Sequence, residues 1–496
     1  MAISSAVSAS AVARVVGIKT EYKNLGVGGV TFLPQRLAIV GQGASSVAYP
    51  TTKKQVTSAL EAAQNYGFGS PVHLACLQLL PVNGDGVSVP VTVYPLEDDG
   101  SGVASTGDIE PSGTQTEVAA YFVEISGIRS QSFVISPGDA IADICTAIAA
   151  AINAVLEMPV VATAGSTDVD ISAKWKGESG NDLSIKVVGS ESAGTTFAVT
   201  QPTGGLVNPS VDSALAQMGE VWESMILNLL NVSDTAALDA YSDFGEGRWG
   251  ALTKKPLMAF SGSTEVDRAT AVTLPDSRKA DRVNVQLMCP GSPDLPFVAA
   301  AGQLTRIITI ANDNPPKDYG SQKAKYIEPG LDGEQWDYAA KDAAVKAGCS
   351  TVDVKDGVVS LSDTVTFYHP QGDPLPAYRY VCDIVKLQNV IFNLNLIFDN
   401  PEWDGAPLIP DDQPTINPDA KKPKTAKAAV AALVDGLGQN AIISDPDYTK
   451  ERIQAAINPQ NPKRLDIMVP VKLSGNANII SIDLNFGFYF DEQPLV

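Results

Sequence analysis

The residues from Asn478 to Asp491 alternate strictly between apolar and polar side chains. Successive side chains of an extended strand point to opposite faces, so one face of this segment is entirely apolar. That face carries Ile480, Ile482, Leu484, Phe486, Phe488 and Phe490. An apolar strand with unpaired backbone groups is a template for association, so it must be covered and paired. The segment therefore either closes a sheet within its own chain or pairs with another copy of the chain.

Length and composition predict a globular protein of several domains. A chain of 496 residues is too long for one hydrophobic core, and its 44% apolar and 18% charged content is not that of a disordered chain. The net charge of −21 argues against a protein that coats nucleic acid, because neutralising phosphates requires a basic face.

The cysteines and the apolar stretches indicate a protein made in a reducing compartment. The five cysteines are scattered, without a CxxC pair, and we interpret them as reduced core residues. The Ala/Ser-rich start has no basic region before its apolar residues, which favours an arm over a signal peptide. The longest apolar stretch, Ile144–Leu156, contains Asn153 and is too short to cross a membrane. We therefore expect no membrane insertion.

The pattern of elements divides the first half of the chain into three parts. Residues 1–35 are small and polar and form an N-terminal arm. Residues 36–83 are α/β, with strand RLAIV, a helix at Thr52–Tyr66 and a strand PVHLACLQLL. Residues 84–202 contain short β-runs, the first of them VPVTVYPL, around one helix at Asp139–Glu157. This range predicts a mostly β domain inserted into the α/β part.

The α/β pattern resumes over residues 203–398. Apolar strands LMAFSG and NVQLMC lie among helices near 210–230, 235–245, 265–280, 295–311, 333–347 and 378–395, which predicts a mostly parallel sheet. Residues 399–477 form a further domain with a Pro- and Asp-rich linker, helices at Thr425–Leu437 and Pro446–Ile457, and a strand at Leu465–Leu473. Residues 478–496 are the C-terminal β arm. The fold class is thus multi-domain α/β and α+β.

One string resembles a nucleotide-binding loop. In RLAIVGQGASS a strand is followed by Gly41 and Gly43, with Ser46 in place of the third glycine. However, Pro50 separates this loop from the next helix, and the acidic residue expected about 20 positions later has only Glu61 as a candidate. A loop without a nucleotide is the preferred interpretation.

The chain offers little for catalysis. Its histidines are His73, in an apolar run, and His369, before a proline, and the GxSxG, HExxH and GxxxxGK[ST] strings are absent. We therefore expect no catalytic, cofactor-binding or metal-binding residues. Two alternatives stay open: a nucleotide-dependent α/β enzyme that uses residues 41–46, and a carbohydrate-binding or adhesive module in residues 84–202.

A basic run leads into the helix at Thr425–Leu437. Lys421, Lys422, Lys424 and Lys427 oppose the positive end of the helix dipole, so they need another reason to be there. They are either a solvated helix start or a surface that meets an acidic protein.

Residues 348–369 have the pattern of a β-meander. A helix ends at Gly348, a strand follows, and Asp356-Gly357 predicts a tight hairpin turn before two more strands through Leu361 and Phe367.

These strings together resemble the contractile-tail sheath proteins of bacteriophages, most closely the Mu-like branch. The points of similarity, spread over nearly all of the chain, are GCSTVDVKDGVVSLSDTVTFYHPQGD after WDYAAKDAAVKA, KWKGESGNDLSIKV, NPSVDSALAQMG, and the terminal LDIMVPVKL with IISIDLNFGFYF.

The resemblance implies a structural, non-enzymatic protein with a sheath core, a protruding inserted domain and arms that complete small sheets in neighbouring subunits. Its implied partners are other copies of itself in stacked hexameric rings, the tail tube, and baseplate and tail terminator proteins. Its implied location is the virion tail, assembled in the host cytoplasm. With this resemblance, the terminal strand is predicted to pair with another subunit, and the lysines at 421, 422, 424 and 427 to face the tube.

Overall fold

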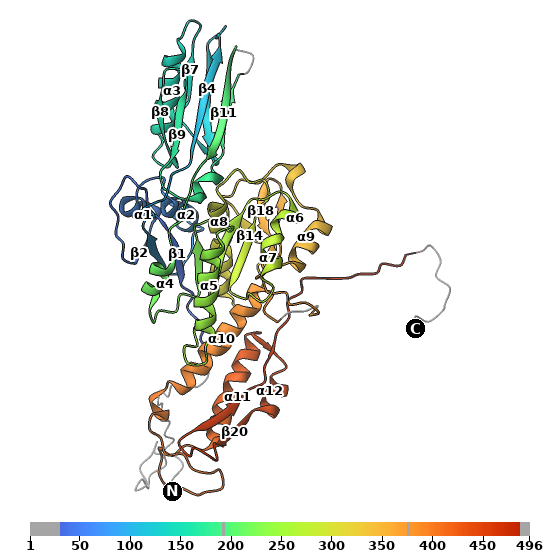
Figure 1. Ribbon diagram of the computed structural model, residues 1–496. Coiled ribbons are helices and arrows are strands. Elements are labelled where there is room, and N and C mark those ends of the chain that lie inside the picture. Colours follow the sequence, from blue (N-terminus) through green and yellow to red (C-terminus); the bar gives the residue numbers. More distant parts are fainter. Residues whose placement is uncertain (1–29, 191–193, 374–376, 487–496) are drawn as a thin grey trace, which may run out of the picture. The chain divides into compact units, whose positions relative to one another are not determined.

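The computed structural model describes residues 30–190, 194–373 and 377–486 (Figure 1). The described chain divides into two compact units. The smaller includes Asn393–Lys472, and the larger includes Phe32–Phe392 and the segment that begins at Leu473. The division falls within helix α10 (Val381–Phe398).

A seven-stranded sheet is the centre of the large unit. Its order is β16-β14-β13-β12-β1-β3-β2, and neighbouring strands are parallel except for β2, which is antiparallel to β3. The strands are β1 (Leu37–Gln42), β2 (Lys54–Val56), β3 (Val91–Leu96), β12 (Met225–Asn228), β13 (Met258–Ser263), β14 (Asn284–Met288) and β16 (Cys349–Ser350). The mostly parallel sheet predicted from the sequence is confirmed.

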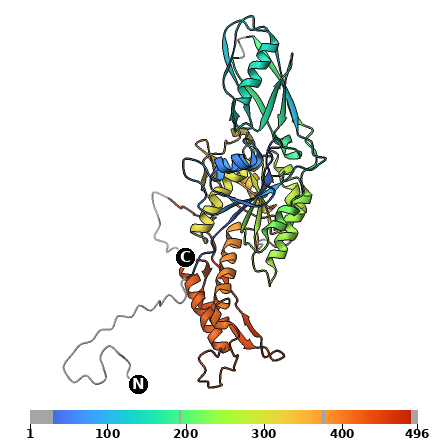
Figure 2. The ribbon, with the colours of Figure 1, turned by 90° about the vertical axis from the view of Figure 1, so that its left-hand side faces the viewer.

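Helices cover both faces of this sheet (Figure 2). Every residue of β1, β3, β12, β13 and β14 is buried, which explains why these strands are apolar runs and not alternating ones. One face packs on α1 (Ala59–Tyr66), α2 (Pro71–Leu79) and α8 (Pro296–Asp313). The other packs on α4 (Asp212–Met218) and α5 (Thr235–Trp249).

Four sequence predictions in this unit are wrong. PVHLACLQLL is not a strand: Ser70 caps it and Pro71 begins helix α2. VPVTVYPL does not belong to the inserted domain, because β3 pairs in parallel with β1 in the central sheet. The second half of the helix predicted near 210–230 is instead the buried central strand β12. Likewise, the helix predicted from Thr52 begins at Ala59, after the edge strand β2.

The inserted domain contains two antiparallel sheets and helix α3 (Ile141–Asn153). One sheet joins β10 (Ile185–Gly189), β5 (Ala119–Ile125), β6 (Ile128–Arg129) and β7 (Phe133–Ile135). The other has the order β11 (Thr195–Thr203), β4 (Thr106–Gly113), β9 (Val169–Ala173) and β8 (Val160–Ala164). The fully buried Trp175 packs edge-on against Phe297 of α8 and so fixes this domain to the central sheet.

The predicted hairpin near residue 356 is confirmed. Strands β17 (Val352–Lys355) and β18 (Val358–Leu361) are joined by Asp356 and Gly357, with φ of 53° and 72°. The third strand is β15 (Lys323–Ala324), not the predicted segment through Phe367. The remaining helices of the large unit are α6 (Arg268–Ala271), α7 (Thr273–Ser277) and α9 (Tyr338–Lys346).

The small unit contains α11 (Pro423–Gln439), α12 (Pro446–Arg452) and a hairpin of β20 (Gln454–Ile457) and β21 (Leu465–Met468). The helix predicted over Pro446–Ile457 therefore ends at Arg452, and its last residues form β20. Short strands β19 (Ile443–Ser444) and β22 (Lys472–Leu473) form a second pair.

Helix α10 is long and apolar enough to cross a membrane by length and composition alone. Half of that 18-residue window is buried within the protein, and it contains the buried polar residues Lys386 and Asn389.

Candidate functional site: an exposed terminal segment and its surroundings

The loop after β1 is filled by the protein's own side chains. A Cβ on Gly41 would lie 2.4 Å from the Leu229 side chain, and one on Gly43 would lie 2.4 Å from the Tyr49 ring. Both glycines therefore make room for neighbouring side chains. The fingerprint instead requires glycines that let a phosphate approach the backbone.

Hydrogen bonds close the same loop. Gln42 Nε2 donates to Asp98 Oδ1 at 2.6 Å and to the Lys176 carbonyl at 2.8 Å, and Ser45 Oγ donates to Asp98 Oδ2. A carboxylate at this position repels phosphate, and no helix begins until Ala59. These contacts argue against the nucleotide-binding alternative.

Both histidines are buried within the fold. His73 Nδ1 accepts a hydrogen bond of 2.9 Å from the Gly69 N–H, and burial lowers its pKa to about 4. His369 contacts the Phe367 carbonyl and Asp276. Their contacts are those of structural residues, as the sequence predicts for His73, although His73 lies in a helix and not in a strand.

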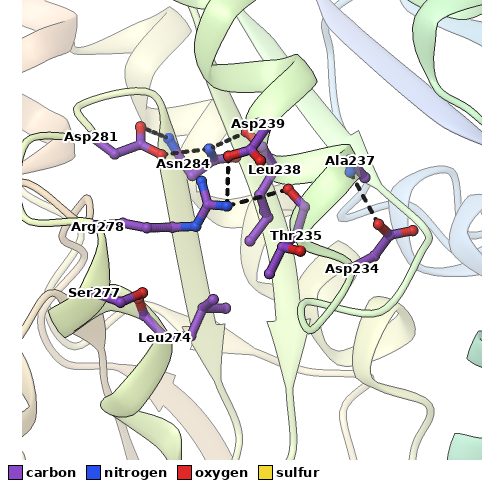
Figure 3. Close-up of polar contacts among 10 residues, drawn as sticks. All are labelled: Asp234, Thr235, Ala237, Leu238, Asp239, Leu274, Ser277, Arg278, Asp281 and Asn284. Carbon is purple, nitrogen blue, oxygen red and sulfur yellow. Dashed lines mark hydrogen bonds and ion pairs between the residues drawn. The ribbon is translucent and has the colours of Figure 1, made fainter.

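A polar cluster between α5, α7 and β14 also has a structural role (Figure 3). Arg278 donates to Asp239 at 2.7 Å, and Asn284 Nδ2 donates to Asp281 at 2.7 Å and to the Leu238 carbonyl at 2.9 Å. Asn284 begins β14, so the cluster lies at the amino end of a parallel strand, whereas ligands of such sheets bind at the carboxyl ends. Within the residues that the structure describes, no group of three or more His, Cys, Asp or Glu side chains is arranged to hold a metal ion.

The terminal segment is exposed. Ile480, Ile482, Leu484 and Phe486 are 76%, 81%, 82% and 85% exposed, and over 474–486 the described chain forms neither helix nor strand (Figure 1). Phe488 and Phe490 lie outside the described residues. Along its described length, the apolar face therefore has no cover from the rest of the described chain, and pairing with another copy stays a prediction.

The basic run has local partners that the sequence did not suggest. Lys421 Nζ lies 2.9 Å from Glu402 and 5.3 Å from the centre of the Trp403 ring. Lys422 donates to the Gln413 carbonyl, and the backbone N–H of Lys424 donates to Asp411 at 2.9 Å. These lysines fasten the preceding loop to the start of α11.

Lys424 and Lys427 are both exposed on the first turns of α11, but Lys424 also contacts Asp411 of the preceding loop. That a tube is the partner of this region stays a prediction.

The hairpin β20–β21 has an apolar face and two edges without a partner strand in the described chain. Ala455 pairs with Ile467 and Ile457 with Leu465, and this hairpin packs against α11. An isolated two-stranded hairpin is only marginally stable, so each edge is a place where a further strand would add.

Comparison with known proteins gives one curated relative. The Mu-like prophage FluMu tail sheath protein of Haemophilus influenzae is 24% identical over 304 residues, which are 60% of this chain and 61% of that relative. The match thus spans less than two thirds of the relative's length. It confirms the resemblance to Mu-like tail sheath proteins. No family model matches the chain.

Three solved structures align with most of the chain at low identity. The sheath tail protein from Listeria innocua aligns with a TM-score of 0.49 at 12% identity, over 90% of this chain and 94% of its own. The sheath tail protein from Desulfitobacterium hafniense gives 0.46 at 10%, over 93% and 100%. The contracted helical sheath of the anti-feeding prophage gives 0.46 at 9%, over 96% and 99%.

Proposed function

We propose that this chain is a structural subunit of a contractile phage tail sheath. It polymerises as stacked hexameric rings around the tail tube and contracts to drive the tube through the host cell envelope for genome ejection. The observation that carries the proposal is the exposed, strand-patterned segment Ile480–Phe486 in a chain whose curated relative is a tail sheath protein. A head-to-tail contact that does not close generates a helical array, which is the geometry of a sheath.

In this proposal the terminal segment of one subunit adds to the β20–β21 hairpin of another. The hairpin's apolar face, with Ile457, Leu465 and Ile467, packs on α11, and an added strand continues that face with Ile480, Ile482, Leu484 and Phe486. Backbone hydrogen bonds supply affinity, and the alternating side chains fix the register.

The further partners follow from the proposed role. They are the tail tube, facing Lys427 and the start of α11, and the baseplate and tail terminator proteins at the two ends of the sheath. The subunit is assembled in the bacterial cytoplasm and then belongs to the virion tail. It has no enzymatic step in this role.

Negative-stain electron microscopy of the purified chain tests the proposal. We expect long hollow cylinders at high protein concentration. A strictly monomeric species at the same concentration would contradict it. Glycan-array binding by the full chain would instead favour the alternative of an adhesive module in the inserted domain, and tight nucleotide binding in calorimetry would favour the enzyme.

A further inference from the structure

The residues just before the exposed terminal segment bond to a buried lysine of helix α10. Lys386 of α10 has no exposed side-chain surface, yet it carries an ammonium group with three N–H donors. Nζ lies 2.8 Å from Asp383 Oδ1 on the same helix, 2.6 Å from the Ser474 carbonyl and 2.6 Å from Asn476 Oδ1. All three donors are therefore satisfied, two of them by the residues that lead into the terminal segment.

The side-chain amide of Asn476 also bonds to a second part of the core. Its Nδ2 donates to the Pro316 carbonyl at 2.9 Å, while its Oδ1 accepts from Lys386. The Cys382 thiol lies 3.6 Å from the same Oδ1. The side-chain amide is thus held through both its oxygen and its nitrogen.

The contacts end abruptly along the chain. Ser474 and Asn476 are half-buried, whereas every described residue from Ala477 to Phe486 is exposed. The change falls within one residue of Asn476, so the Lys386 contacts mark the boundary between fixed chain and exposed arm.

The chain at Leu33, at the start of the large unit, is held on the same turn of α10. Asn389, which is fully buried, accepts a hydrogen bond of 2.8 Å from the Leu33 N–H and donates to the Val385 carbonyl. Asn389 follows Lys386 by three residues, a rise of about 4.5 Å along the helix. The chain at Leu33 and the chain at Ser474 and Asn476 are therefore bonded to neighbouring side chains of α10.

We propose that this turn of α10 is the anchor of both arms, with Lys386 as the positioning residue of the C-terminal arm. The inference rests on the proposed sheath function. When a neighbouring subunit pulls on the arm, the load reaches the core at Lys386. Displacing the arm would remove two of the three oxygen partners of this buried ammonium, Ser474 and Asn476, and leave only Asp383 of its own helix. The arm beyond Asn476 then links two subunits from a point that is fixed on the core of its own subunit.

Two variants of the full chain test the anchor. Lys386→Met keeps the length and apolar stem of the side chain but removes all three hydrogen bonds. Asn476→Ala, at a half-buried position outside the helices, removes one of the arm's two contacts with Lys386 and leaves the Ser474 carbonyl in place. It provides the test if the first variant does not fold. Lys346→Met is the matched control, because Lys346 is exposed on α9 and forms an ion pair with Asp342 of the same helix.

The first readout is hydrogen exchange in the dilute, unassembled protein. We expect residues 474–478 to exchange about ten-fold faster in Lys386→Met and Asn476→Ala than in the parent, with the central strands β1 and β13 unchanged. Asn389→Ala should raise exchange at residues 33–35 in the same way. Unchanged exchange at 474–478 in both C-terminal variants would overturn the anchor.

The second readout is the length of cylinders in electron micrographs. We expect the two variants to form about ten-fold fewer or shorter cylinders, and Lys346→Met to match the parent. Faster exchange with normal cylinders would overturn the mechanical role of Lys386 while leaving the sheath function intact. Absence of cylinders from the parent itself would overturn the sheath function, and the anchor's role in assembly with it.

Discussion

Gln201 and Ile185 exchange two hydrogen bonds and so join the two sheets of the inserted domain. The Ile185 N–H donates to Gln201 Oε1 at 2.8 Å, and Gln201 Nε2 donates to the Ile185 carbonyl at 2.9 Å. Gln201 lies where the register of β11 shifts between Thr200 and Thr203. The irregularity turns the side chain toward β10, where it takes the place of a neighbouring strand.

Replacing Gln201 by Leu should therefore destabilise the inserted domain. The change leaves the N–H and the carbonyl of Ile185 without partners, and we expect a loss of about 2 kcal/mol in the free energy of unfolding. Urea denaturation followed by circular dichroism measures it. Thr200→Val, on the exposed face of the same strand, should change the free energy by less than about 0.5 kcal/mol. Equal effects of the two changes would show that the Gln201 contacts contribute nothing specific.

Acid should weaken the fold through His73. Burial lowers the pKa of its imidazole to about 4, whereas an unfolded histidine titrates at about 6.5. The unfolded chain binds the proton first, so this contribution is complete above about pH 6.5 and is lost as the pH falls toward 4, up to about 3 kcal/mol.

His73→Gln tests this pH dependence. Glutamine keeps an acceptor for the Gly69 N–H but does not titrate, so the variant should lose less stability than the parent between pH 6.5 and 4.5. Denaturant midpoints measured across that range give the comparison. Parallel curves for both proteins would exclude His73 as the source of acid sensitivity.

Deleting residues 478–496 should separate folding from assembly. The described part of this segment is exposed, so its removal should leave the free energy of unfolding within about 0.5 kcal/mol of the parent. Cylinders should disappear from electron micrographs, because the donated strand is gone. A truncated chain that still polymerises would refute the arm even if the sheath proposal stands.

Charge reversal at the start of α11 should affect tube binding and folding through different lysines. We expect Lys427→Glu to weaken co-sedimentation with preformed tail tubes about ten-fold at low salt, without altering the melting temperature. Lys421→Glu should instead loosen the preceding loop, because it places a carboxylate beside Glu402. Reversing Lys421, Lys422, Lys424 and Lys427 together should impair assembly on tubes, and normal co-sedimentation of that variant would contradict the tube-facing prediction.

The sequence predicts the elements whose signals are local. Asp356-Gly357 specifies its own turn through left-handed backbone angles, and RLAIV is a buried strand by composition alone. PVHLACLQLL is different, because a short apolar run fits a buried strand and a buried helix equally well. The Ser70 cap and Pro71 were the signals that distinguish the two.

The surroundings of the terminal segment could be predicted only in part. The alternation of apolar and polar residues identified the apolar face, because that pattern depends only on consecutive residues. The Lys386 contacts with Ser474 and Asn476 join residues about 90 positions apart, and nothing local distinguishes this lysine from a surface one. The partners of Lys421 and Lys422 are likewise fixed by how the loop folds back on the helix start.

The exposed arm has a genetic consequence in the proposed lattice. A subunit that lacks residues 478–496 still carries the β20–β21 hairpin, so it accepts a strand from one neighbour but gives none to the next. Each such subunit therefore acts as a chain terminator, and its effect grows with the number of positions in the array. A minority of truncated copies expressed beside the intact gene should therefore stop assembly of most sheaths. The truncation should behave as a dominant-negative mutation.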